Sequence, residues 1–160
     1  MKIPFAISAR TAHLIGMENF ANAEGAIIEL VKNAYDADAD TCVVVADIRE
    51  DNVKSKLFII DNGSGMTDEI IIKHWMTIGT DDKLLNARSS NKKRVKSGAK
   101  GIGRFALNRL GTSAEMLSFA SNEFGKGYVW NVDWKKFDKA RVLSDVEANL
   151  EEITIDYLAS

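Results

Sequence analysis

Helix-like segments come early in this chain, and strand-like segments come late. An amphipathic helix is predicted over residues 22–35, because Asn22 is a favourable N-cap and apolar residues recur behind it at helical spacing. The last third contains three strand-like segments, TSAEMLSFAS, GKGYVWNVDW and EEITIDYL. This order predicts an α/β fold, a two-layer sandwich of helices on a mixed, largely antiparallel sheet, rather than a doubly wound parallel sheet.

The middle of the chain adds two strands, two helices and a long polar loop. Residues 41–48 and 56–61 are short and rich in β-branched or aromatic side chains, so both are predicted strands. A helix over 67–79 opens with acidic residues in its first turn, and a shorter helix is predicted over 102–111. Residues 80–98 show no period, which predicts a mobile loop.

Side-chain patterns also predict which residues are buried. The glycines at 125 and 127 favour a hairpin between the first two late strands. Cys42 is the only cysteine and lies in the apolar run TCVVVADI, which predicts a reduced residue in the core. The apolar stripe expected to face the sheet from the helix over 22–35 comprises Ala26, Ile27, Leu30, Val31 and Ala34.

Basic charge is concentrated in one part of the chain. The 160 residues carry a net charge of −2, yet nine Lys or Arg and no Asp or Glu lie between Lys83 and Arg109. This clustering favours an anionic partner over a merely solvated loop. The sequence contains no segment of signal-peptide or membrane-spanning length, so a cytoplasmic protein without a membrane partner is expected.

The first candidate motif lies on the helix over 22–35. Glu29, Asn33 and Asp36 are spaced by four and three residues, which places their side chains on one helical face. A solvated polar edge would give the same spacing. Two acids and an amide are also the groups that a hydrated magnesium ion and an attacking water require.

The second candidate motif follows the strand over 56–61. Asp61 ends this strand, and Gly63 and Gly65 come next at two-residue intervals. Asp-Asn-Gly is a common turn signal, so the motif alone is weak evidence of function. A carboxylate at a strand end could also accept a hydrogen bond from an exocyclic amine, with glycines allowing a base to lie close to the backbone.

The third candidate motif is the glycine-rich stretch GAKGIGRFALNRLG. Gly98, Gly101 and Gly103 precede a helix whose first amides lack partners, and this combination favours an anion. A tight turn would use the same glycines. The stretch lacks the GK[ST] ending of a P-loop, and a polar loop rather than a strand precedes it.

Taken in this order, E-x-x-x-N-x-x-D, D-x-G-x-G and the glycine-rich turn resemble the GHKL superfamily of ATPases. This superfamily includes DNA gyrase B, the ninety-kilodalton heat-shock chaperone, sensor histidine kinases and MutL. The similarity covers about residues 8–132, and GAKGIGRFA and IGTDDK are nearest to the chaperone, MORC and MutL branches. The resemblance implies a Bergerat fold, ATP as substrate and Mg²⁺ as cofactor.

The resemblance also assigns roles to individual residues. It implies that Glu29 activates water, Asn33 coordinates Mg²⁺, Asp36 lies near the adenosine and Asp61 binds the adenine amino group. The other positions implied to contact the nucleotide are Gly63, Gly65 and Met66 in the base pocket, Gly79 and Thr80 near the base, and Gly98, Lys100, Gly101, Ile102, Gly103 and Arg104 around the phosphates.

A further set of expectations concerns the behaviour of the whole domain. Residues 81–97 are expected to form a lid that closes over ATP, so that slow hydrolysis drives conformational change. We expect one GHKL domain over 1–160, the N-terminal fragment of a longer protein that forms a nucleotide-dependent homodimer. The superfamily's late Gly-Thr strand is not evident, because Thr154 has no glycine before it.

Two alternative functions remain open at this point. One is a nucleic-acid-binding module that grips phosphates with the basic loop 83–109. The acids at Glu29, Asp36 and Asp61 argue against it, since they repel a polyanion. The other is a kinase-type ATP domain, which is disfavoured because no proline follows either histidine.

Overall fold

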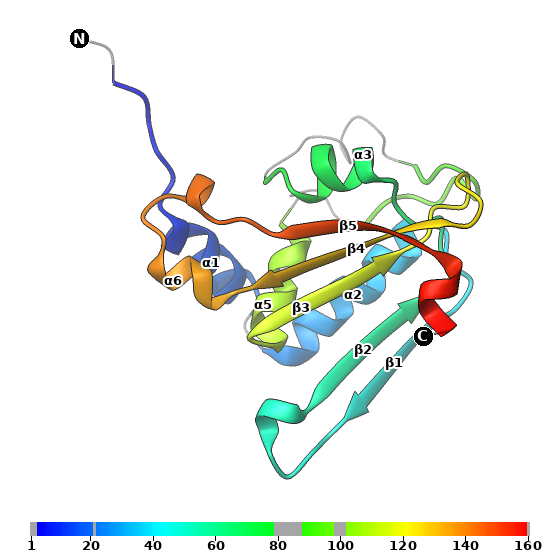
Figure 1. The fold of residues 1–160 in the computed structure, drawn as a ribbon, viewed down its shortest axis with the longest axis horizontal. Coiled ribbons are helices and arrows are strands. Elements are labelled where there is room, and N and C mark those ends of the chain that lie inside the picture. The colour runs from blue at the N-terminus through cyan, green and yellow to red at the C-terminus, as the bar shows by residue number, and fades with distance from the viewer. Residues whose placement is uncertain (1–2, 21, 79–87, 98–101, 160) are drawn as a thin grey trace.

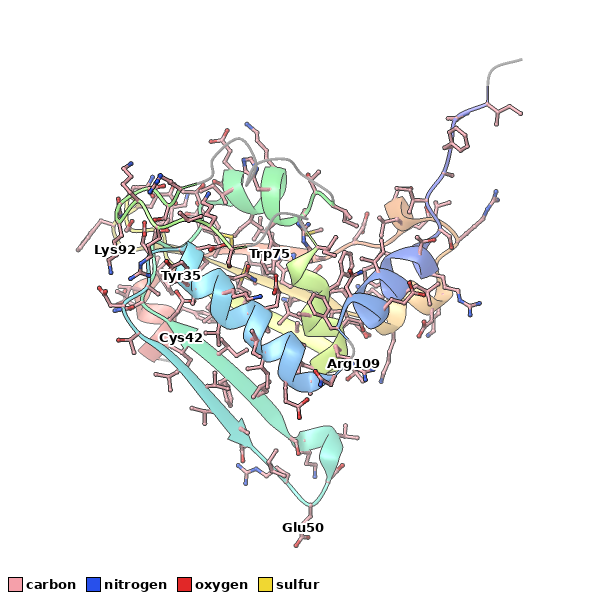
Figure 2. The ribbon with its side chains drawn as sticks, turned by 180° about the vertical axis from the view of Figure 1, so that it is seen from behind. Tyr35, Cys42, Glu50, Trp75, Lys92 and Arg109 are labelled. Atoms are coloured by element: carbon pink, nitrogen blue, oxygen red, sulfur yellow. The ribbon has the colours of Figure 1, made fainter. Side chains whose placement is uncertain are left out.

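The computed structural model describes residues 3–20, 22–78, 88–97 and 102–159. The helices α2 (Ala23–Asp36) and α5 (Ala106–Leu110) lie on one face of two antiparallel sheets, behind the strands in Figure 1 and in front of them in Figure 2. The predicted α/β sandwich is therefore confirmed. None of the described helices combines the length and the hydropathy needed to span a bilayer.

The predicted helix over 22–35 is confirmed as α2 (Ala23–Asp36). Asn22 caps it, since its side-chain oxygen accepts a hydrogen bond from the backbone N–H of Gly25 at 2.8 Å. Of the predicted apolar stripe, Ala26, Leu30 and Ala34 are buried, Ile27 is partly buried, and Val31 is 37% exposed.

A helix that the sequence did not predict precedes α2. This is α1 (Ala9–Asn19), which packs against the later helical segments α5 (Ala106–Leu110) and α6 (Lys135–Lys139). It has no acidic residue in its first turn and no basic residue in its last turn. Without charges that complement the helix dipole, contacts with the rest of the protein stabilise this segment as a helix.

The two early strands are confirmed as β1 (Cys42–Asp47) and β2 (Lys56–Asp61), with the short helical turn η1 (Asn52–Lys54) between them. They form an antiparallel hairpin in which Cys42 is paired directly with Asp61. The predicted core position of Cys42 is wrong. The residue is partly exposed because it lies at the end of a two-stranded sheet.

The helix predicted over 67–79 is present in two parts, α3 (Asp68–Ile70) and η2 (Ile71–Trp75). Thr67 caps the first part, accepting the backbone N–H of Ile70 on its hydroxyl at 3.3 Å. The second part is a wider turn, closed by the hydrogen bond from Met76 N–H to Ile71 O at 2.8 Å.

The helix predicted over 102–111 is also confirmed in two parts. A tight turn, η3 (Gly103–Phe105), leads into α5 (Ala106–Leu110). The backbone N–H of Gly111 donates to Leu107 O at 3.1 Å, where the helix ends. This short unit packs against both α1 and α2. It therefore brings the end of the glycine-rich stretch to the early helices.

The late strands form a second sheet in the order β3-β4-β5. Their bounds are Ser113–Ser118, Lys126–Asp133 and Asn149–Thr154. The predicted hairpin is confirmed, with Gly125 in the left-handed region (φ +74°) directly before β4. The last predicted strand ends at Thr154, and the chain continues as the helical turn η5 (Ile155–Ala159).

Two short elements between β4 and β5 were not predicted. They are α6 (Lys135–Lys139) and η4 (Leu143–Asp145), which contact α1. Elements this short contain too few residues to show a helical period. Together with α1 they close one end of the molecule (Figure 1).

The described strands form two sheets. In the described part of the chain every strand pair is antiparallel, and β2 and β3 belong to separate sheets. The turn after β2 nevertheless contacts both the last residue of β3 and the segment that follows β3. Ser121 N–H donates to Ser64 O at 2.9 Å, and Met66 N–H donates to the Ser118 hydroxyl at 2.7 Å.

The hydrophobic core lies between the helices and the β3-β4-β5 sheet. Trp130 and Trp134 are 3% and 4% exposed. Trp75 meets Trp130 edge to face, with ring centres 5.7 Å apart. The buried side chains that form this cluster are Phe20, Ala26, Leu30, Ile71, Phe105, Ala106, Tyr128, Trp130, Val132, Trp134 and Phe137.

Candidate functional site

The first motif lies along α2 as its spacing predicts. Glu29 and Asn33 are half-buried, and Asp36 is 9% exposed. Glu29 pairs with Lys32 at 3.2 Å on the next turn of the helix. One oxygen of Asp36, Oδ1, accepts hydrogen bonds from the backbone N–H of Ser97 at 2.8 Å and from its hydroxyl at 3.3 Å. Asp36 therefore binds the segment that leads into the glycine-rich stretch.

The second motif packs on the C-terminal end of α2. Asp61 Oδ1 accepts the backbone N–H of Gly63 at 2.8 Å, which fixes the carboxylate at the strand end. Ser64 N–H donates to Ala37 O at 2.8 Å. A Cβ on Gly63 would lie only 2.8 Å from the same Ala37 oxygen. The contact between the two motifs thus requires a residue without a side chain at position 63.

Gly65 and Met66 complete the second motif beside β3. Gly65 has φ +65°, and a Cβ there would lie 2.1 Å from the backbone oxygen of Phe119. Both the left-handed conformation and the close backbone approach exclude other residues. Met66 is partly buried and packs against the hydrophobic core. The turn after Asp61 is consequently held by the core on one side and by α2 on the other.

The third motif meets the first at Gly103. A Cβ built on Gly103 would lie 3.5 Å from Asn33 Nδ2 and 3.7 Å from Glu29 Cγ. Ile102, the preceding residue, is partly buried against the core. The described residues of all three motifs therefore gather around one face and one end of α2.

The side chain of Arg104 points into the protein. Its residue is 8% exposed, Nη2 donates to His74 O at 3.1 Å, and the guanidinium carbon lies 5.7 Å from the centre of the Trp75 ring. Burial lowers the pKa of Arg104 to about 10, so the group stays charged at neutral pH. A direct contact with phosphate from this position would come from the backbone of Arg104.

Arg104 also borders an apolar cavity of about 280 Å³, lined by Met76, Ile78 and Trp130 among others. No residue of α2 or of the turn after Asp61 lines it. Among the predicted site residues that the structure describes, only Arg104 takes part, so we attribute this cavity to the core. The predicted positions Gly79, Thr80, Gly98, Lys100 and Gly101 lie outside the described residues.

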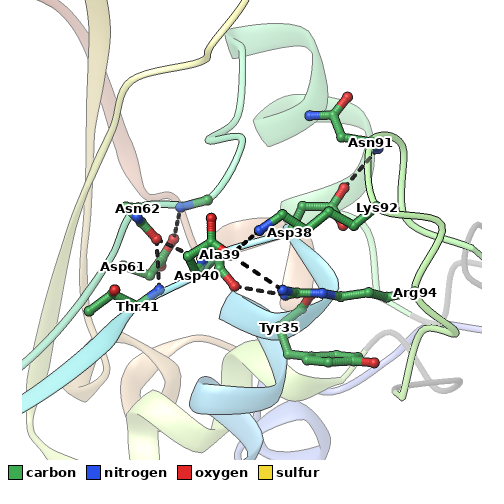
Figure 3. Close-up of polar contacts among 11 residues, drawn as sticks. Tyr35, Asp38, Ala39, Asp40, Thr41, Asp61, Asn62, Asn91, Lys92 and Arg94 are labelled. Carbon is green, nitrogen blue, oxygen red and sulfur yellow. Dashed lines mark hydrogen bonds and ion pairs between the residues drawn. The ribbon is translucent and has the colours of Figure 1, made fainter.

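An acidic cluster at the C-terminal end of α2 was missed in the sequence (Figure 3). Asn91 N–H donates to Asp38 Oδ2 at 2.8 Å, and Lys92 forms an ion pair with Asp40. Burial raises the pKa of Asp38. The opposing effects outweigh it, so the pKa is lowered overall: hydrogen bonds come from the Ser89 hydroxyl and the N–H groups of Asn91 and Lys92, and Arg94 adds a positive charge.

The hydrogen bond and charge of Lys92 lower the pKa of Asp40 as well. The sequence does contain a signal for this cluster, since Asp38 and Asp40 of the acidic run DADAD meet Lys92 and Arg94 of the basic run KKR. Residues 88–97, predicted as part of a mobile loop, are thus anchored to the end of α2. The anchoring depends on pairing between opposite charges, which a search for hydrophobic periods cannot detect.

The chain is similar in sequence to a known protein family. The family model described as histidine kinase-, DNA gyrase B-, and HSP90-like ATPase matches residues 21–159. The matched range contains α2, the turn after Asp61 and the glycine-rich stretch. No curated protein sequence is significantly similar to the chain.

Proposed function

Because the chain belongs to the family of histidine kinase-, DNA gyrase B- and HSP90-like ATPases, we propose that it binds Mg·ATP where its three motifs meet and hydrolyses it slowly. ATP binding itself follows from membership of this family. The observation that carries the proposal is the position of Gly103 against Glu29 and Asn33. At this junction the backbone of Gly103, predicted to bind phosphate, adjoins Glu29, the predicted general base, and Asn33, the predicted metal ligand.

The donor set at this junction suits magnesium. Mg²⁺ is commonly held by one or two protein oxygens, several waters and the phosphates of its substrate. The described residues hold no cluster of three or more His, Cys, Asp or Glu side chains that could bind a metal without a substrate. The amide oxygen of Asn33 would hold the ion together with the phosphates. When bound, the ion would neutralise charge that builds up on the phosphates.

The phosphates would lie along the glycine-rich stretch beside α2. Gly103 has no side chain, so a phosphate oxygen could approach both its backbone and the amide of Asn33. A methyl group at position 103 would occupy this space. Lys100, Gly98 and Gly101 remain predicted phosphate contacts in the same stretch.

Asp61 would select adenine. Its carboxylate accepts the Gly63 N–H on Oδ1, and the residue is exposed to a ligand. A carboxylate accepts hydrogen bonds only, so it fits the exocyclic amine of adenine and repels the carbonyl oxygen at the same position of guanine. Gly63, Gly65 and Met66 would form the surface against which the base lies.

Glu29 would act as the general base. It takes a proton from water as the water oxygen attacks the γ-phosphorus, and ADP leaves with the electrons of the broken P–O bond. Lys32 Nζ lies 3.2 Å from Glu29 Oε2, beside the proposed base. The proton then passes from Glu29 to solvent, which restores the site.

We further propose that hydrolysis is coupled to a lid over 81–97 and to nucleotide-dependent dimer formation in a longer protein. The γ-phosphate would supply the contact that distinguishes ATP from ADP. Stronger protection of residues 83–100 from trypsin by a non-hydrolysable ATP analogue than by ADP would support the lid. Equal protection by both nucleotides would contradict it.

A nucleic-acid grip on the basic loop 83–109 is a weaker candidate. Lys92 and Arg94 lie against Asp40 and Asp38, so part of the positive charge is already neutralised within the protein. A kinase-type domain would bind ATP through the same residues without releasing phosphate to water. Phosphate release therefore separates these two candidates from the proposed ATPase.

The direct experiment titrates the protein with nucleotides in a calorimeter and follows phosphate release in parallel. We expect ATP and ADP to bind in the presence of Mg²⁺, GTP to bind poorly, and ATP to be hydrolysed slowly. Equal binding of GTP and ATP would contradict the role of Asp61. Absence of nucleotide binding would contradict the proposed function as a whole.

A further inference from the structure

We infer that Arg94 is a positioning residue for the nucleotide site. It fastens residues 88–97 to the C-terminal end of α2 and thereby fixes Ser97, the residue directly before the glycine-rich stretch. The inference rests on the proposed function, because its main consequence is measured in nucleotide binding.

Arg94 contacts the end of α2 in two ways (Figure 3). Its Nη1 donates to Ala39 O at 2.7 Å and to Tyr35 O at 3.3 Å, and its guanidinium carbon lies 4.8 Å from the centre of the Tyr35 ring. The last carbonyls of a helix lack intrahelical partners, and the helix dipole favours a cation there. A planar guanidinium can bond to carbonyls and stack on a ring at once, whereas an ammonium group cannot stack in this way.

The turn that carries Arg94 is a closed unit. Ser89 is 1% exposed, its hydroxyl accepts Arg94 N–H at 2.8 Å, and its own N–H donates to Arg94 O at 2.9 Å. Arg88 and Val95 form an isolated bridge around this pair. Because the backbone of Arg94 is fixed within the turn, anchoring its side chain anchors the turn as a whole.

Asp36 extends this anchoring to the glycine-rich stretch. Its Oδ1 accepts both the N–H and the hydroxyl of Ser97, at 2.8 and 3.3 Å. Asp36 lies about one helical turn after Asn33 on the same face of α2. A shift of the turn would therefore move Ser97 relative to Asn33, the predicted magnesium ligand.

A second set of contacts connects the turn to Asp61, the residue predicted to bind adenine. Asn62, which follows Asp61, accepts the backbone N–H groups of Asp40 and Thr41 at 2.9 Å each. The Asp40 carboxylate in turn pairs with Lys92. The turn is thus linked to both ends of the proposed nucleotide site through continuous contacts.

Three variants test the role of Arg94. Arg94→Met removes the guanidinium, Arg94→Lys keeps the charge without the planar group, and Lys93→Met removes one charge from the same turn as a control. Lys93 Nζ bonds to Ser90 O within the turn, so its loss leaves the contacts with α2 in place. The measurements are the dissociation constant of Mg·ATP, turnover at saturating ATP, and trypsin cleavage after Arg88 and Lys96 without nucleotide.

In Arg94→Met we expect the dissociation constant to rise about tenfold while turnover at saturating ATP stays within about twofold, because Glu29 and Asn33 are intact. Trypsin cleavage should accelerate about tenfold as the turn detaches. Arg94→Lys should give intermediate values, and Lys93→Met should match the wild type. A general loss of folding would instead lower binding and turnover together, without partial rescue by lysine.

Tyr35→Leu is the second variant, in case Arg94→Met does not fold. It removes the ring from an exposed position of α2 and should weaken binding and speed cleavage less than Arg94→Met. An unchanged dissociation constant in the folded variants overturns the inference, whatever the trypsin result, and leaves the proposed function standing. If the wild type binds no nucleotide, the proposed function fails and the inference fails with it.

Discussion

Gly103 and Asn33 lie against each other although they are distant in the sequence: a Cβ on Gly103 would come within 3.5 Å of Asn33 Nδ2. This contact joins the glycine-rich stretch to the polar face of α2. It also leaves room beside the Asn33 amide, because the glycine has no side chain. A phosphate with its magnesium ion would use this room under the proposed function.

Replacing Gly103 by alanine tests whether this space is used. The added methyl group would make only ordinary contacts, at 3.5 to 3.7 Å, so the free energy of unfolding should change by about 0.5 kcal/mol or less. The affinity for Mg·ATP should fall about tenfold or more, which corresponds to about 1.4 kcal/mol, because the methyl group blocks the phosphate. Gly111→Ala, at the far end of α5, is the control and should bind normally. Unchanged affinity in Gly103→Ala would contradict the proposed phosphate position.

The reactivity of Cys42, the single cysteine, tests whether the charge of Asp61 lies beside it. Burial, and secondarily the charge of Asp61 opposite it in the hairpin, raise the pKa of Cys42 above its ordinary value of 9.0. The reactive thiolate is therefore scarce at neutral pH, and alkylation by iodoacetamide should become fast only above pH 9. Asp61→Asn removes one cause of the raised pKa, so alkylation at pH 8 should be faster than in the wild type.

The control for this measurement is Asp47→Asn, which removes a charge at the opposite end of β1. It should leave the alkylation rate of Cys42 unchanged. Saturating ATP should slow alkylation in the wild type, because the proposed base site lies beside the thiol. Equal rates in Asp61→Asn and the wild type would contradict the geometry of the hairpin.

Gly65 should be the most sensitive glycine of the second motif. A residue other than glycine in the left-handed region costs about 1–3 kcal/mol, and alanine at position 65 would in addition meet the backbone oxygen of Phe119 at 2.1 Å. Gly125→Ala provides a matched control, since its φ is +74° but no atom lies within 4 Å of the added Cβ. Urea denaturation should show a clearly larger loss of stability in Gly65→Ala than in Gly125→Ala. Similar losses of stability would mean that the backbone shifts and so removes the close contact between the alanine Cβ and the Phe119 oxygen.

Local signals were sufficient to predict most of the elements that build the site. The cap at Asn22 and the apolar stripe behind it identified α2, and β-branched runs identified the strands β1 and β2. The spacing of Glu29, Asn33 and Asp36 then placed three polar side chains on one helical face. Each of these features depends on neighbours within a few residues, so the sequence alone predicts it.

Features that depend on distant contacts could not be predicted in the same way. The orientation of Arg104 follows from the carbonyl of His74 and the ring of Trp75, which no local pattern relates to it. Likewise α1 shows no charge pattern of its own and depends on packing. The strand predicted through residue 158 ends at Thr154. The prediction ran too far because the alternation of apolar Ile and Tyr continues in the sequence after the backbone has turned.

The most direct measurement compares Mg·ATP binding and phosphate release in the wild type and in Glu29→Gln. Glutamine keeps the shape of the side chain but cannot accept a proton from water, so hydrolysis should fall about 10²-fold or more. The dissociation constant of Mg·ATP should stay within about threefold of the wild type, because the base and phosphate contacts remain. A parallel loss of binding and hydrolysis, or undiminished hydrolysis, would contradict the assignment of this junction as an ATPase site.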